Sequence, residues 1–99
     1  MIDLLSKIYV DLNELVIRKV SHDKEILSTR IIKEHTKICE YCFNIKSSNK
    51  DKNYMLEFKV SIKYILFILK YFISKKIINN DVYKIIEKEY KDLYYIINP

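Results

Sequence analysis

The fold depends on how one stretch is interpreted, YMLEFKVSIKYILFILKYFIS at residues 54–74. From Tyr54 to Tyr64 apolar and polar residues alternate, and a period of two is typical of a half-buried strand. The apolar residues also recur at the three- and four-residue spacing of a helix, at Met55, Phe58, Ile62, Leu66, Leu69 and Ile73. Both interpretations stay open up to residue 62, whereas residues 62–76 are predicted to be helical.

The residues before this stretch decide what a strand would pair with. Residues 41–46 also alternate apolar and polar, and the polar segment SSNKDKN at residues 47–53 is typical of a loop. The two alternating runs would then form one β-hairpin around residues 40–62. A lone hairpin is marginally stable in water, so it would have to pack against helices.

The remaining segments predict helices. Residues 2–19 place an apolar stripe on one face, and Ser21 is a candidate N-cap for a second helix that begins at His22. Asn79 and Asp81 begin a last helix over residues 81–98, which carries its own apolar face. The two stripes are Leu5, Ile8, Leu12 and Leu15, and Val82, Ile86, Leu93 and Ile97. We therefore predict a mainly α fold, a small single-domain helical bundle of about four helices over residues 1–99.

The composition excludes several functions. The chain has no glycine, and dinucleotide loops, phosphate loops and nucleophile elbows all need glycine where a Cβ would clash. Arginine occurs only at Arg18 and Arg30, so lysine supplies 18 − 2 = 16 of the basic residues behind the net charge of +5. Lysine, isoleucine, asparagine and tyrosine have AT-rich codons, which indicates an AT-rich genome: that of an archaeon, of a low-GC bacterium, or of a virus or mobile element living on one.

The first residues and the apolar stretches of the sequence predict where in the cell the protein is located. Asp3 and Lys7 come too early for the apolar core of a signal peptide. The most apolar stretch, residues 64–73, contains Lys70 and is shorter than the roughly 20 residues that span a membrane. We expect a cytoplasmic protein, in the host cytoplasm if the source is a virus, with no membrane partner.

Three potential metal ligands follow one another at helical spacing. His35, Cys39 and Cys42 lie at i, i+4 and i+7, which places them on one face of a helix. Zinc takes four ligands, and the nearest further donors are His22 and Glu34. Cysteine is also among the most buried residue types. We predict that these residues are core packing, with no metal, no cofactor and no small-molecule substrate inferred.

Arg30 and His35 form an Arg-x4-His pattern that resembles the motif of HEPN ribonucleases, which are small helical domains that act as dimers. The resemblance covers six residues and implies that Arg30 and His35 would grip the scissile phosphate and help to activate the sugar hydroxyl. The other interpretation is a solvated Arg30 and a His35 at the edge of the core. A HEPN-like ribonuclease is therefore kept as a third function.

Clusters of lysine favour a second function, a basic nucleic-acid-binding domain that grips the phosphate backbone. Thirteen acidic residues are interspersed with them, so an ordinary solvated surface is the other interpretation. The lysines expected to contact nucleic acid are Lys46, Lys50, Lys52, Lys59 and Lys63.

The leading interpretation is a small non-enzymatic protein-interaction module. The chain carries more apolar and aromatic residues than a core of this size needs, and surplus apolar surface is typical of an interface. We expect a homodimer or another protein partner, as for an accessory subunit or a viral or mobile-element factor that masks a host protein. The residues expected at the interface are Phe67, Tyr71, Tyr83, Tyr90 and Tyr94. No catalytic residue is predicted.

Overall fold

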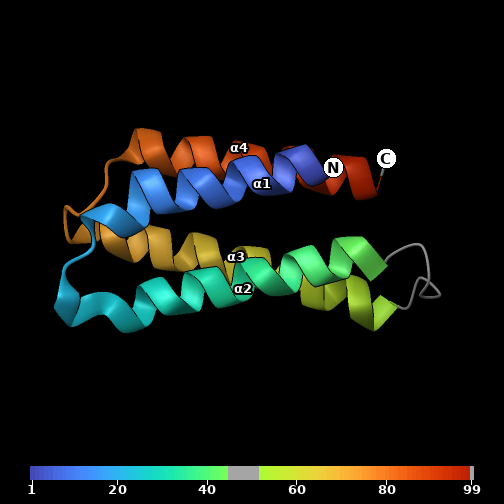
Figure 1. Cartoon of the computed structure of the whole chain (residues 1–99), viewed down its shortest axis with the longest axis horizontal. Coiled ribbons are helices and arrows are strands. Elements are labelled where there is room, and N and C mark those ends of the chain that lie inside the picture. Colours follow the sequence, from blue (N-terminus) through green and yellow to red (C-terminus); the bar gives the residue numbers. More distant parts are fainter. Residues whose placement is uncertain (45–51, 99) are drawn as a thin grey trace.

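The computed structural model describes the backbone of residues 1–44 and 52–98 and the side chains of residues 1–44 and 55–98. Four helices dominate these residues: α1 (Ile2–Asp11), α2 (Glu25–Asn44), α3 (Lys52–Ser74) and α4 (Asn80–Ile97). Each helix runs antiparallel to the one before it, with α1 and α4 in one layer and α2 and α3 in the other (Figure 1). The prediction of a mainly α helical bundle is confirmed.

The predicted β-hairpin is absent from the described residues. Residues 40–44 end α2 and residues 52–62 begin α3, so the helical interpretation of the stretch is correct, and residues 45–51 lie outside the described part. The reason is that α3 is apolar on two opposite faces, with Phe58 buried and Leu56 and Val60 exposed. A helix with two apolar faces produces runs of alternating apolar residues, which imitate the period of a strand.

The core lies between the two layers and draws on all four helices. The apolar residues predicted for the first and last helices are mostly buried, including Leu5, Ile8, Leu12, Ile86 and Leu93. In the first helix the stripe differs at its end, because a π-helical turn at Leu12–Val16 follows α1. Fully buried Val16 takes the place predicted for Leu15, which packs only at the edge of the core.

The helix starts follow the local sequence. The side chain of Asn79 accepts a hydrogen bond of 3.0 Å from the backbone N–H of Val82, which confirms the predicted cap of α4. Ser21 has extended backbone angles before a short 3-10 turn at His22–Lys24, but its hydroxyl donates to Asp23 and caps no backbone N–H. The α-helical part of α2 therefore begins at Glu25.

The end of α3 needs a left-handed residue, and the chain supplies a lysine. Lys76 has φ of 61°, its N–H donates to the carbonyl of Ile73, and the N–H of Ile77 donates to the carbonyl of Phe72. These two bonds form a Schellman motif, in which glycine is preferred because a Cβ raises the energy of the left-handed conformation.

We expect Lys76→Gly to raise the free energy of unfolding by about 0.5–1 kcal/mol, because it relieves this conformational cost. Urea denaturation measures the effect. Lys75→Gly is the matched control, since the neighbouring residue does not have a positive φ and its replacement loses up to about 1 kcal/mol. Equal effects of the two substitutions would contradict the assignment.

No helix in residues 1–44 or 52–98 is long and apolar enough to cross a membrane.

Candidate interaction surface

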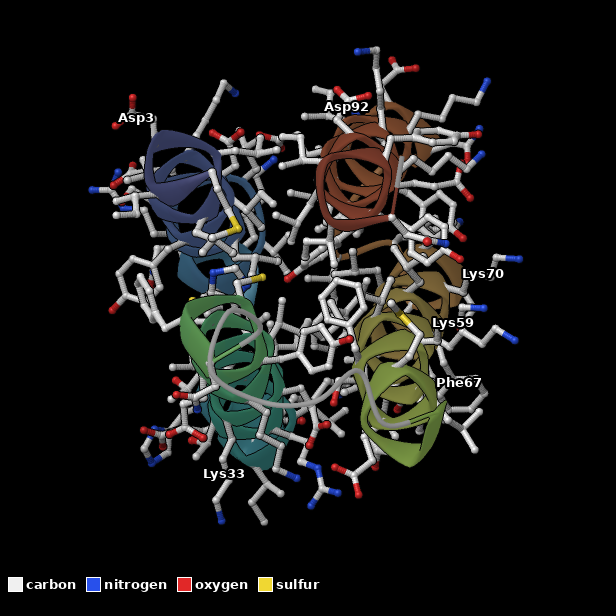
Figure 2. The ribbon with its side chains drawn as sticks, turned by 90° about the vertical axis from the view of Figure 1, so that its right-hand side faces the viewer. Asp3, Lys33, Lys59, Phe67, Lys70 and Asp92 are labelled. Atoms are coloured by element: carbon white, nitrogen blue, oxygen red, sulfur yellow. The ribbon has the colours of Figure 1, made fainter. Side chains whose placement is uncertain are left out.

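Helix α3 is apolar on the side that faces solvent as well as on the side that faces the core. Its buried side includes Phe58, Ile65 and Phe72. Its outward side carries five exposed large apolar residues at spacings of three and four, here called the outer stripe: Leu56, Val60, Tyr64, Phe67 and Tyr71. Phe67 extends away from the bundle into solvent (Figure 2). A surface helix normally has a polar outer face, so the outer stripe is surface that another molecule can cover.

Three lysines, here called the lysine row, follow α3 between the outer stripe and α4: Lys59, Lys63 and Lys70. Among the described residues no carboxylate lies within ion-pair distance of them. Instead, Lys59 Nζ lies 5.4 Å from the ring centre of Tyr94, and Lys70 Nζ lies 5.6 Å from that of Tyr83. Figure 2 shows Lys59 and Lys70 on the same side of the bundle as Phe67.

A groove runs between α3 and α4 beside the lysine row. It consists of two hollows of about 230 and 270 Å³ that share Lys63 and Leu66 in their walls, and we call it the α3/α4 groove. Its walls combine apolar side chains with four lysines and one carboxylate: Lys59, Ile62, Lys63, Leu66, Phe67, Lys70, Tyr83, Glu87, Tyr90, Lys91, Tyr94 and Tyr95.

Some of the residues predicted at the interface are exposed in the structure and others are buried. Phe67 and Tyr71 are exposed, and Tyr94 is partly exposed in the wall of the groove. Tyr83 is buried at its edge, and Tyr90 is only 1% exposed. Tyr90 lies inside because its hydroxyl bonds to the buried His35, so it belongs to the core rather than to an accessible surface.

Of the lysines predicted to contact nucleic acid, only two have side chains that the structure describes. Lys59 and Lys63 lie together in the lysine row. The backbone of Lys52 begins α3, but its side chain is not described, and Lys46 and Lys50 lie outside the described residues.

A second apolar groove, which the sequence analysis missed, lies between α1 and α2. It has a volume of about 350 Å³, and α1 and α2 lie on the side of the bundle opposite the lysine row (Figure 2). Exposed Ile2, Tyr9, Val10 and Phe43 surround it, and none of the residues in its walls is an acid, lysine or arginine. The signal in the sequence was the pair Tyr9 and Val10, two large apolar residues off the predicted stripe. We call this the α1/α2 groove.

His35 lies at the base of the α1/α2 groove and joins three helices. Its Nε2 is 3.1 Å from the carbonyl oxygen of Leu5 in α1, and its Nδ1 is 2.7 Å from the hydroxyl of Tyr90 in α4. Because a carbonyl can only accept, Nε2 carries the proton and Nδ1 accepts from the Tyr90 hydroxyl. Burial lowers the pKa of His35, so a neutral ring with both nitrogens bonded holds α1, α2 and α4 together.

The structure does not bring Arg30 and His35 together. Arg30 lies at 3.2 Å from the buried carboxylate of Glu34 and stacks over Tyr64, 4.8 Å from its ring centre. Glu34 also accepts from Ser61 of α3 at 3.0 Å, so Arg30 compensates a buried charge between α2 and α3. His35 bonds to α1 and α4 instead, so the two side chains are held by different partners.

The cysteines lie in the core and at its edge. Burial raises the pKa of the Cys42 thiol to about 12 and also raises the pKa of Cys39. Thiols with raised pKa values are poor nucleophiles and poor metal ligands, because both roles need the thiolate. In the described parts of the chain no three His, Cys, Asp or Glu side chains are grouped so that they could hold a metal ion.

A buried carboxylate connects α1 with α4. Lys7 Nζ lies 2.8 Å from Asp11 Oδ2 and 3.1 Å from Glu89 Oε2, whereas Glu89 Oε1 is buried and has no hydrogen-bond partner among the described residues. Burial, together with the neighbouring Asp11 carboxyl, raises the pKa of Glu89 despite the opposing effect of Lys7. The cluster therefore contributes to the contact between the two helices, and its residues line neither groove.

Comparison with known proteins adds no relative from which a function could be carried over: no family model, no curated protein and no solved structure matches this chain significantly.

Proposed function

We propose that this chain is a small non-enzymatic protein-interaction module that works by binding and associates with itself. The observation that carries the binding of a partner is that α3 is apolar on two opposite sides and, among the described residues, only one side is used by the core. Leaving five large apolar side chains in water costs solvation free energy that a partner would recover on binding. An accessory subunit and a factor that masks a host protein are both modules of this kind.

The two grooves differ in charge, and this difference indicates which of them suits a second copy of the chain and which suits another protein. The α1/α2 groove has no acid, lysine or arginine in its walls, so two copies can meet there without bringing like charges together. The lysine row beside the outer stripe would face another lysine row if two copies met on α3. We infer that copies of the chain meet at the α1/α2 groove and that α3 is left for a different protein.

We expect Val10→Asp to shift the chain toward monomer in light scattering at high protein concentration, because the substitution puts a charge into the α1/α2 groove. Val60→Asp is the matched control, since Val10 and Val60 are 53% and 51% exposed and belong to α1 and α3, which lie diagonally across the bundle (Figure 2). Val60→Asp should keep the oligomer and weaken capture of a partner. A wild-type chain that stays strictly monomeric at high concentration would contradict self-association.

The alternative function is nucleic-acid binding through the lysine row. The observation in its favour is the lack of carboxylate partners for Lys59, Lys63 and Lys70 among the described residues. Phosphate contacts of this kind weaken steeply as salt rises. A gel-shift assay with DNA and RNA at about 50 mM salt tests it, and an absence of binding there removes this alternative.

A further inference from the structure

We propose that the α3/α4 groove binds an acidic amphipathic helix of a partner protein. This inference rests on the proposed function, because it names the partner chemistry of the surface on α3. It is drawn from three features of the described residues: the length of the groove, the apolar character of its floor, and the excess of lysines over carboxylates in its walls.

The groove has the length and lining that a helix requires. From Lys59 to Lys70 it follows twelve residues of α3, whose eleven steps rise about 16 Å, or three helical turns. Ile62, Leu66 and Phe67 supply apolar contacts along this length, where a docked helix would place apolar residues at i, i+3 or i+4, and i+7. Tyr94 and Tyr95 of α4, which are accessible, lie in the opposite wall.

The charge along the groove selects an acidic partner. Four lysines and one carboxylate, Glu87, line the two hollows, and Lys91 lies 3.9 Å from that carboxylate. The members of the lysine row lie at i, i+4 and i+11 on α3, so carboxylates repeated along one flank of a docked helix would meet them in turn. A second copy of this chain would bring lysines instead.

The apolar lining favours a protein over a nucleic acid. A phosphate backbone would leave Leu66, Phe67 and the neighbouring outer stripe in contact with water. Arginine, which binds phosphate with two parallel bonds, is also absent from the groove, since Arg30 is occupied by Glu34 and Tyr64. Lys59 and Lys70 lie over the rings of Tyr94 and Tyr83. A nucleic-acid base would need these ring faces for stacking, so the two lysines compete with it.

The test uses the whole chain and a fluorescent helical peptide of about 18 residues, with leucine on one face and glutamate on both flanks. Its control is the same peptide with glutamine in place of every glutamate. In fluorescence anisotropy we expect the acidic peptide to bind at least about tenfold more tightly than the glutamine peptide at low salt, and this difference to shrink as salt rises. Equal affinities, or no binding of either peptide, would overturn the inference.

Two charge reversals locate the binding site. Lys63→Glu should weaken the acidic peptide by about tenfold or more, whereas Lys33→Glu, on an exposed lysine of α2 on the far side of the bundle, should change it little (Figure 2). Equal losses of affinity in the two variants would mean that the peptide is attracted by the overall charge, and would contradict the assignment of the site. A single-stranded oligonucleotide that displaces the peptide and binds more tightly would also overturn the inference, in favour of nucleic acid. The Val10→Asp result is independent of these measurements, so self-association can stand when the peptide fails.

Discussion

Phe72→Ala should lower the free energy of unfolding by about 3–5 kcal/mol, a large part of the stability of a domain of this size. Phe72 is 0% exposed in the core near the end of α3, and truncation removes apolar contacts and leaves a cavity. Urea denaturation at low protein concentration measures the loss as a lower midpoint with an unchanged slope.

The matched control for this substitution lies five residues earlier on the same helix. Phe67 is 71% exposed, so Phe67→Ala should change stability by no more than about 0.5 kcal/mol. If Phe72→Ala does not fold at all, Phe72→Leu keeps most of the volume and should cost less than about 1.5 kcal/mol. Similar losses for Phe67→Ala and Phe72→Ala would mean that the side of α3 assigned to the core is wrong.

Acidification below about pH 6.5 should destabilise the protein through His35, by up to about 1.4 kcal/mol per pH unit. Burial lowers the pKa of His35 in the folded state, so between that pKa and 6.5 the unfolded chain binds more protons than the folded one. Stability then rises with pH in this window and is constant above it. Protonation would also force a proton onto Nδ1, where the Tyr90 hydroxyl now donates.

The contribution of His35 is isolated by comparing variants. His35→Gln should flatten the pH dependence between the folded pKa and 6.5, and His22→Gln, which removes an exposed histidine, should keep it. Glu89 acts in the opposite direction, because its raised pKa makes the folded state bind more protons than the unfolded chain. Its contribution to the free energy of unfolding therefore falls as the pH rises above about 4.5. Subtracting the His35→Gln curve from the wild-type curve removes that contribution. A wild-type slope that survives in His35→Gln would refute the role of His35.

Local signals made much of the fold predictable. Asn79 caps α4 as its position before the apolar stripe predicted, and Leu5, Ile8 and Leu12 face the core. The stretch at residues 54–74 was ambiguous because α3 has two apolar faces, so the feature that made its structure hard to predict is the one that carries the proposed function.

The contacts between distant residues could not be predicted from a single sequence. His35 and Tyr90 are 55 residues apart, and nothing in either neighbourhood indicates the other. Tyr90 was predicted at an interface because it lies beside the apolar stripe of the last helix. Only the packing of the bundle, which brings His35 of α2 to Tyr90 of α4, shows that its hydroxyl is used inside. The α1/α2 groove likewise exists only once the two helices are packed together.

The antiparallel order of the helices bears on how quickly the chain folds. Successive helices such as α2 and α3 are neighbours in space, and helical bundles with mainly local contacts fold in microseconds to milliseconds. The exception is the pairing of α1 with α4, which joins the two ends of the chain through Lys7 and Glu89. Loop-closure entropy opposes that pairing most, so the two terminal helices are the part of the bundle expected to assemble last.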